Sequence, residues 1–180
     1  MNRLDDTRPF IPLRIAILTM SDTRTAAEDK SGDALAEMAT ASGHTVAGRA
    51  LVRDDADAIR AKVAGWIADP AVDVVITTGG TGFTGRDVTP EAIKPLFEKE
   101  IDGFAILFHQ ISFQSVGTST IQSRACGGIA RGTLIFCLPG STGACRDAWN
   151  GILKGRLDTR PRPCNFVEIM PRFEEHRPKR

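Results

Sequence analysis

The strongest constraint on the fold of this chain is a short apolar segment that leads directly into a glycine-rich loop. Residues Asp73–Thr77 read DVVIT and lack polar alternation, which is typical of a strand buried in a parallel sheet. Four of the 17 glycines then fall within Gly79–Gly85, and Thr89-Pro90-Glu91 predicts the start of a helix. A strand, a glycine loop and a helix in this order indicate an α/β unit.

The rest of the chain alternates strands and helices in the same way. Further apolar runs predict strands at Arg14–Thr19, Thr45–Val52 and Thr133–Leu138. Apolar residues at helical spacing predict helices at Asp29–Ser42, from Asp54 or Asp55 to Asp69, at Pro90–Lys99, around Phe104–Ile111 and around Ala144–Ile152. We therefore expect an α/β fold, with a doubly wound, mainly parallel sheet and helices on both faces.

The 180 residues fit one α/β domain, which we place at residues 13–157, after an N-terminal extension at 1–12. The C-terminal arm, residues 158–180, belongs to a stretch from Arg156 that holds four of the ten prolines and no glycine. It predicts an extended segment. Two interpretations of it stay open: a loosely packed tail, or a contact between copies of the chain made by Phe166, Val167, Ile169 and Met170.

Composition excludes several classes of protein. The net charge is +1, whereas a general binder of nucleic acid or of an anionic membrane needs a basic excess. No apolar run approaches the roughly 18–20 residues that span a bilayer. The N-terminus has no signal pattern, and Cys126, Cys137, Cys145 and Cys164 show no metal-binding or redox spacing, so we expect no zinc site and a cytoplasmic location.

Small polar and glycine residues follow three of the predicted strands, in Ser21–Thr23, Gly79–Gly85 and Pro139–Gly143. Because the carboxyl ends of parallel strands meet at one edge of the sheet, these loops are expected to converge there. Open α/β sheets bind their ligands at that edge. The sequence thus predicts a ligand site before any family is considered.

The glycine loop itself favours phosphate as the ligand. Gly80–Gly85 matches GxGxxG, but no helix opens at once, and no Lys-Ser/Thr pair follows as in a Walker A loop. The backbone N–H groups of such a loop attract anions. Asp87 would repel a bare phosphate, so its presence suggests a bridging Mg²⁺. A mobile surface turn remains the alternative.

Taken together, the motifs resemble the molybdenum-cofactor biosynthesis family of MoaB, MogA and the gephyrin N-terminal domain. The resemblance spans about Arg14 to Phe166 and rests on Ser21-Asp22-Thr23, Thr77–Gly82 (TTGGTG), Arg86–Ala92 (RDVTPEA), Gly117–Ala125 (GTSTIQSRA) and Leu138–Thr142 (LPGST). It implies a doubly wound α/β fold that binds molybdopterin, a pterin with a dithiolene and a terminal phosphate. Gly117–Ala125 and Arg162–Phe166 (RPCNF) look like the MoaB branch in particular.

The resemblance also implies a reaction and a site. The MogA-like and archaeal MoaB-like members of the family transfer AMP from ATP to the terminal phosphate of molybdopterin and release pyrophosphate. By this likeness Asp87 and Asp54 would be catalytic and hold Mg²⁺, with ATP and molybdopterin as substrates. The expected phosphate- and pterin-binding residues are Ser21, Asp22, Thr78, Gly79, Gly80, Thr81, Gly82, Glu91, Pro139, Gly140 and Ser141. Asp54 and Ser141 could instead serve only as helix N-caps, with Asp55 competing for the role of Asp54.

Other functions stay open at this stage. The chain could be a non-catalytic pterin-binding or scaffold protein of the same pathway, or, on the glycine loop alone, a generic nucleotide-binding module. Many bacterial members carry Gly-Phe-Gly-Glu followed by an Arg, where this chain has Gly103–Ile106 (GFAI) and then His109, which we expect to pack or cap locally. The family further implies a homo-oligomer built from trimers, expected here as a hexamer, and small-molecule partners with no nucleic acid or membrane.

Overall fold

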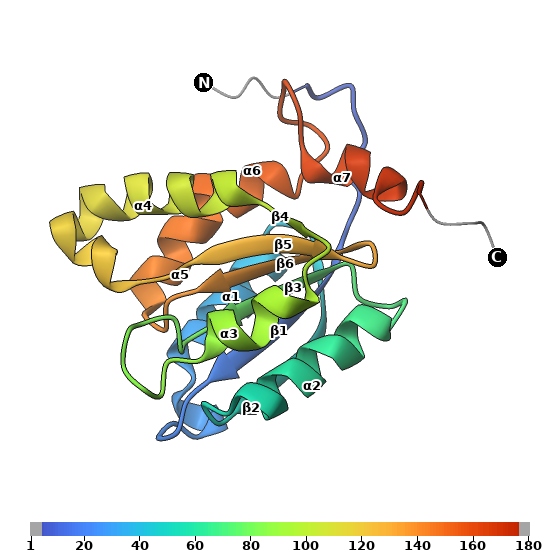
Figure 1. Cartoon of the computed structure of the whole chain (residues 1–180). Coiled ribbons are helices and arrows are strands. Elements are labelled where there is room, and N and C mark those ends of the chain that lie inside the picture. Colours follow the sequence, from blue (N-terminus) through green and yellow to red (C-terminus); the bar gives the residue numbers. More distant parts are fainter. Residues whose placement is uncertain (1–4, 177–180) are drawn as a thin grey trace.

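A single six-stranded sheet lies at the centre of the computed structural model, which describes residues 5–176 (Figure 1). The strand order is β2-β1-β3-β6-β5-β4, with bounds β1 Arg14–Met20, β2 Thr45–Val52, β3 Val74–Thr78, β4 Lys99–Glu100, β5 Cys126–Ala130 and β6 Thr133–Leu138. The pairs β1–β2, β1–β3 and β3–β6 are parallel, whereas β5 and β4 join antiparallel. The expected mainly parallel α/β sheet is confirmed.

Helices cover both faces of this sheet, as expected (Figure 1). Their bounds are α1 Lys30–Ala41, α2 Ala56–Ala68, α3 Thr89–Ile93, α4 Asp102–Val116, α5 Thr142–Ala148, α6 Lys154–Arg156 and α7 Phe166–Ile169. One apolar layer lies between the sheet and α1, α4 and α5, and the other lies beneath α2 and α3. A π-helical turn, Trp149–Leu153, joins α5 to α6 and buries Trp149 in the first layer.

The prediction of a helix over Pro90–Lys99 was wrong in its second half. Helix α3 ends at Ile93, a 3₁₀ turn covers Lys94–Leu96, and the short strand β4 follows. Pro95 explains the break, because proline has no N–H to donate and its ring clashes with the carbonyl four residues earlier.

Strand β5 was missed because Gly127 and Gly128 interrupt the apolar pattern that marks a strand. Contacts with neighbouring side chains explain both glycines. A Cβ at Gly128 would lie 2.3 Å from Phe97, and one at Gly127 would lie 3.1 Å from Phe136. The close approach of these rings therefore excludes larger side chains at both positions. The two glycines leave no apolar periodicity from which the strand could be predicted.

The C-terminal arm is not extended. It forms α7 and a 3₁₀ turn at Met170–Arg172, and Phe166, Val167 and Met170 pack against the chain's own core. The arm also meets the N-terminal extension, since the Asp5 N–H donates to the Arg160 carbonyl at 3.0 Å and the Asp5 carboxylate pairs with Arg162 at 2.7 Å. Its apolar residues mainly stabilise this fold.

The parallel strands β2, β1, β3 and β6 all end at one edge of the sheet. Because β5 runs antiparallel to β6, its first residues begin at that same edge. Loops that start at Ser21, Arg53, Gly79 and Pro139, and the segment leading into Cys126, therefore meet there. Within residues 5–176, no helix is long and apolar enough to span a membrane.

Candidate functional site

A cavity of about 420 Å³ opens where these loops meet, and we call it the acidic cavity because it contains Asp22, Asp54 and Asp87. Its walls are formed by Met20, Ser21, Asp22, Thr23, Arg24, Asp54, Gly79, Gly80, Thr81, Gly82, Asp87, Gln122, Ser123, Pro139 and Gly140. Of the residues predicted for the site, Thr78, Glu91 and Ser141 are not among them. The remaining predicted residues are brought together by the fold.

The glycine loop passes so close to its neighbours that side chains do not fit. Gly79 has a φ of +108°, and a Cβ there would lie 2.4 Å from the Met20 carbonyl oxygen of β1. Gly80 has a φ of +61°, and its Cβ would lie 2.4 Å from the Thr89 hydroxyl and 2.9 Å from an Asp54 oxygen. Only glycine adopts such conformations readily. The two residues let the loop lie directly against Asp54.

Thr89 fixes the base of this loop. Its hydroxyl donates to the Gly79 carbonyl and its N–H donates to the Gly80 carbonyl, both at 2.9 Å. The sequence predicts a helix start at Thr89-Pro90-Glu91, and Thr89 is indeed the first residue of α3, where no side chain caps the helix. Its hydroxyl faces back toward the loop, so it stabilises the site more than the helix.

Asp54 and Asp55 have separate tasks. Asp55 is the N-cap of α2, because its carboxylate accepts the Ala58 N–H at 2.8 Å. The carboxylate of Asp54 is half-buried in the acidic cavity, and the donor that reaches it is the backbone N–H of Asp22. Burial, and then the negative charges of Asp22 and Asp87, raise the pKa of Asp54. A half-buried carboxylate whose pKa is raised is one that a cation would stabilise.

Asp87 is held in place by its own loop. Its carboxylate accepts the Thr84 N–H at 2.9 Å and the Thr84 hydroxyl at 2.7 Å, and it occupies the space that a Cβ at Gly82 would fill. Partial burial acts to raise the pKa of Asp87, but these hydrogen bonds, one from the Gly82 N–H, and the Arg124 charge outweigh it and lower the pKa. Asp87 is therefore an ionised, fixed carboxylate.

Asp22 connects the first loop to the glycine loop. Arg86 grips its carboxylate through two hydrogen bonds, at 2.8 and 2.7 Å, and this contact holds the pKa of Asp22 below its ordinary value. The same carboxylate accepts the Asp54 N–H at 3.3 Å. The sequence assigned Arg86 no role, although it lies in the RDVTPEA motif.

The acidic cavity has the chemistry of a magnesium site completed by a ligand. Among the described residues, no group of three or more His, Cys, Asp or Glu side chains is arranged to hold a metal. Mg²⁺ is commonly bound by one or two carboxylates together with substrate phosphates. Asp54 and Asp87 supply two carboxylates, and the absence of side chains at Gly80 and Gly82 lets these carboxylates lie directly against the loop. These residues therefore fit Mg²⁺ when a phosphate shares its coordination.

Arg124 is a site residue that sequence reasoning missed. Its guanidinium donates to the Gly82 and Asp87 carbonyls, each at 2.8 Å, and pairs with Glu91. Glu91 thus lies outside the acidic cavity. Partial burial acts to raise its pKa, but the bond and charge of Arg124 outweigh this and lower it. The one available signal was the GTSTIQSRA motif, which contains Arg124 and two wall residues, Gln122 and Ser123.

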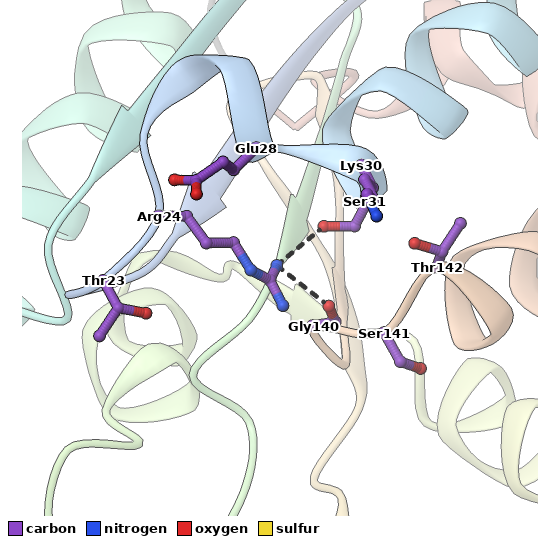
Figure 2. A pocket seen from close by; sticks show the side chains of 8 residues that line it. All are labelled: Thr23, Arg24, Glu28, Lys30, Ser31, Gly140, Ser141 and Thr142. Atoms are coloured by element: carbon purple, nitrogen blue, oxygen red, sulfur yellow. Dashed lines mark hydrogen bonds between the residues drawn. The ribbon is translucent and has the colours of Figure 1, made fainter.

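A second cavity of about 430 Å³ adjoins the first, and we call it the basic cavity (Figure 2). It is lined by Thr23, Arg24, Glu28, Lys30, Ser31, Gly140, Ser141 and Thr142. Ser141 is the N-cap of α5, accepting the Ala144 N–H at 3.1 Å, so its structural role is confirmed and it lines this cavity. Thr78 lies buried beneath, donating to the Pro139 carbonyl at 2.9 Å.

The departure at His109 has a local structural explanation. His109 lies half-buried on α4, and its Nδ1 shares a hydrogen bond of 2.9 Å with the Thr120 hydroxyl in the 3₁₀ turn Gly117–Gln122. Ile106 is 61% exposed on the same helix. Neither residue lines the acidic or the basic cavity. The expected local role of His109 is confirmed.

Comparison with known proteins gives one consistent result. The family described as "Probable molybdopterin binding domain" matches residues 16–159 of this chain. The chain is 53% identical over 157 residues to the Molybdenum cofactor biosynthesis protein B of Escherichia coli (strain K12), which covers 87% of this chain and 92% of that protein.

Solved structures agree with the sequence relatives. A crystal structure of Molybdenum cofactor biosynthesis protein B aligns with a TM-score of 0.83 and 40% identity, over 95% of this chain and 100% of that one. The tungsten cofactor synthesizing protein MoaB from Pyrococcus furiosus aligns with a TM-score of 0.70 and 37% identity, over 77% and 89% of the two chains.

Proposed function

This chain belongs to the molybdopterin-binding domain family and has a role in molybdenum cofactor biosynthesis, and from this premise we propose that it adenylylates molybdopterin. In this proposal ATP donates AMP to the terminal phosphate of molybdopterin, and pyrophosphate leaves. The observation that supports it best is the pairing of two carboxylates over a glycine loop. Asp87 is fixed and ionised, whereas Asp54 is half-buried, has a raised pKa and lies against Gly80.

Each element of the acidic cavity then has a task. The backbone N–H groups of Gly80 and Thr81 would bind phosphate oxygens of the nucleotide, since the positive-φ glycines Gly79 and Gly80 leave room for close approach. Asp54 and Asp87 would hold Mg²⁺. When bound, the metal supplies charge neutralisation for the phosphates. Arg124 keeps the loop in place through the Gly82 and Asp87 carbonyls.

The reaction needs little covalent chemistry from the protein. An oxygen of the terminal phosphate of molybdopterin forms a bond to the α-phosphorus of ATP, and the bond from that phosphorus to the bridging oxygen of pyrophosphate breaks. Such transfers depend on positioning and electrostatic stabilisation. Losing one electrostatic stabiliser costs about 2.7–4 kcal/mol in the barrier, or 10²–10³ in rate.

The proposal is tested by pyrophosphate release from purified protein with Mg-ATP and molybdopterin. Asp87→Asn and Asp54→Asn are each expected to slow release by about 10²-fold or more, because each removes a carboxylate from the metal site. Asp55→Asn is the matched control, since Asp55 caps α2 and lies outside the acidic cavity.

Two outcomes would contradict the proposal. The first is wild-type protein that releases no more pyrophosphate than Asp87→Asn, and the second is a loss of activity in Asp55→Asn as large as that in Asp54→Asn. A calorimetric titration with Mg-ATP then identifies the alternative. A non-catalytic pterin-binding protein binds molybdopterin without affinity for ATP.

We also propose that the protein works as a homo-oligomer, with a trimer-based hexamer as the expected form. Supporting this, α4 and the turn after it expose Ile106, Leu107, Phe113, Val116 and Ile121, each at least 48% exposed. Contiguous apolar surface of this kind marks a contact between proteins. The contact surface would thus lie on α4, whereas the sequence interpretation had considered the C-terminal arm.

A further inference from the structure

Two of the four cysteines face each other across the antiparallel strands β5 and β6, which lie side by side in Figure 1. Cys126, the first residue of β5, is directly opposite Cys137 of β6, and both thiols lie in the apolar layer beneath α2 and α3. Residues opposite each other in an antiparallel pair have Cα atoms about 4.5–5.5 Å apart. A disulfide bond needs Cα atoms about 4.4–6.8 Å apart. The backbone therefore already places the two sulfurs where a bond between them can form.

The two thiols share a hydrogen bond, which gives them different acidities. The Cys137 thiol donates to the Cys126 sulfur, and this bond lowers the pKa of Cys126 although burial acts to raise it. The charges of Lys94 and Arg124 also lower it, whereas Glu100 opposes them. The same bond and complete burial hold the pKa of Cys137 well above its ordinary value. Cys126 is thus the thiol of the pair that ionises first, and the thiolate is the reactive form of cysteine.

A third cavity, of about 490 Å³, adjoins the segment that carries Cys126. Its lining includes Arg124 and Ala125, the two residues before Cys126, together with Lys94, whose charge reaches the Cys126 thiol. Cys126 keeps 5% of its surface exposed, whereas Cys137 has none. Hydrogen peroxide is little larger than water, so it can approach Cys126 from this side but not Cys137.

Neither of the other two cysteines has this arrangement. Cys145 is buried beside the Thr78 hydroxyl at 3.3 Å, and Cys164 is exposed. In the described part of the chain, neither lies opposite a cysteine in a strand pair. A structural zinc site needs four ligands, and the pair at Cys126 and Cys137 is not joined by a third His, Cys, Asp or Glu within residues 5–176. Bond formation between the two sulfurs is the chemistry that remains.

We propose that Cys126 and Cys137 form a reversible disulfide on exposure to hydrogen peroxide, which makes the start of β5 a site of oxidative modification. The Cys126 thiolate attacks one peroxide oxygen. An S–O bond forms, the O–O bond breaks, and the departing hydroxide takes up the proton that the Cys126 thiol released. The Cys137 sulfur then attacks the sulfur of the Cys126 sulfenic acid, and the S–S bond forms as the S–OH oxygen leaves with the Cys137 proton as a second water. The two sulfurs lose two electrons, and the peroxide gains them.

The new bond joins two segments that shape the acidic cavity. Cys126 follows closely after Arg124, which holds the glycine loop through two carbonyls. Cys137 comes just before Leu138 and Pro139, and Pro139 is a wall residue of the acidic cavity. Oxidation thus ties the segment that anchors one loop to the strand that leads into another. This modification does not depend on the proposed adenylyl transfer.

The test is mild oxidation of the purified full-length protein carrying Cys164→Ser, which removes the exposed thiol that would link copies of the chain. After treatment with hydrogen peroxide at pH 8, remaining thiols are blocked with iodoacetamide in denaturant, and the protein is digested with trypsin for mass spectrometry. We expect a cross-link between Cys126 and Cys137, an intact mass lower by two hydrogens before blocking, and full reversal by dithiothreitol.

Cys145→Ala, in the same background, is the matched control. Cys137 and Cys145 share the tryptic peptide 132–146, so this variant also assigns the cross-link. The cross-link should remain in Cys145→Ala, because that buried thiol has no cysteine opposite it. Its loss in Cys145→Ala would mean that Cys126 pairs with the wrong partner and would contradict the proposal.

Two further variants separate the tasks of the thiols. Cys137→Ala should stop at the Cys126 sulfenic acid, which dimedone labels, whereas Cys126→Ala should leave Cys137 unoxidised. Circular dichroism checks that each variant folds, and Cys126→Ala at the edge of the apolar layer suffices if the fully buried position tolerates no change.

Three other results would overturn the inference. The first is no cross-link at a peroxide concentration that oxidises the exposed Cys164 of wild-type protein. The second is a cross-link that survives in Cys126→Ala, and the third is dimedone on Cys137 in place of Cys126. None of these measurements uses ATP or molybdopterin, so they stand or fall separately from the proposed function.

Discussion

Two adjacent aspartates show how finely the site depends on single residues. Asp55 lies at the exposed start of α2 and satisfies a backbone N–H, which is worth about 1 kcal/mol. Asp54, one residue earlier, turns into the acidic cavity and raises the electrostatic energy of the folded protein. The chain thus tolerates an unfavourable charge at the position where a cation would use it.

Because the charge of Asp54 destabilises the folded protein, we predict that Asp54→Asn gains stability in a pH-dependent way. Because the pKa of Asp54 lies above its ordinary value of 3.8, the folded protein holds this proton more tightly than the unfolded chain does. The stabilising contribution is complete below pH 3.8 and is lost as the pH rises through the raised pKa. Asparagine cannot ionise. Urea unfolding in metal-free buffer should therefore show Asp54→Asn slightly more stable than wild type at pH 7, but not at pH 3.5. A difference in the free energy of unfolding that is the same at both pH values would contradict this prediction.

The four cysteines predict a second residue-level result. Cys126, Cys137 and Cys145 are buried, and Cys164 is exposed. Burial raises the pKa of Cys145 to about 11, although the Thr78 hydroxyl acts to lower it. A disulfide reagent at pH 8 should modify one thiol quickly in the native protein and four after denaturation. Fast reaction of two or more native thiols would contradict the described packing.

Among the elements, the glycine loop depends on a residue from outside its own strand–loop–helix unit. Arg124, just before β5, contacts the loop through two carbonyls at 2.8 Å and pairs with Glu91 of α3. The antiparallel strand thus closes the site from the side that the parallel strands leave open. The backbone of Arg124 also contacts the glycine loop, because its N–H donates to the Thr81 carbonyl at 2.9 Å.

We expect Arg124→Ala to lower the free energy of unfolding by about 1.5–3 kcal/mol, the range for hydrogen bonds to charged groups. Hydrogen exchange should show faster exchange of the Asp87 N–H, which donates to Thr84 within the loop. Arg60→Ala is the control, since Arg60 makes an exposed ion pair within α2. Unchanged exchange in Arg124→Ala would show that the loop keeps its conformation without this contact.

The elements that could be predicted from the sequence are those marked by residues within their own segment. The parallel strands β1, β3 and β6 are continuous buried runs, whereas β2 alternates in exposure. The loops after these strands carry the glycines and acids that line the acidic cavity. Strand β5 was missed because its glycines make room for Phe97 and Phe136, which lie on other elements of the fold. Arg24 and Arg124 were missed for the same reason. A lone arginine in a loop has no pattern, and its role arises only where several loops meet.

At the scale of the whole molecule, the apolar surface of α4 remains without a partner in a single chain. Ile106, Phe113 and Ile121 are 61%, 56% and 73% exposed. Soluble proteins rarely leave such a surface uncovered. The other exposed apolar residues, Ile11, Phe83 and Ile169, belong to separate segments of the chain.

Phe113→Glu should therefore reduce the oligomer. Light scattering of wild-type protein at micromolar concentration is expected to give a multiple of 19.4 kDa, and the variant a smaller multiple with an unchanged circular dichroism spectrum. A buried glutamate at a contact between copies lacks a partner and is strongly disfavoured. Wild-type protein that scatters as a monomer would contradict the proposed assembly.

The two ends of the described chain both lie at the amino ends of the parallel strands. Phe10 packs on His44 just before β2, with ring centroids 5.1 Å apart, and a Cβ at Gly132, just before β6, would lie 3.8 Å from Glu174. Both cavities lie at the opposite edge of the sheet. A tether attached at either end therefore leaves the cavities facing solution. The protein can be immobilised on a sensor surface by either end and still admit small phosphates.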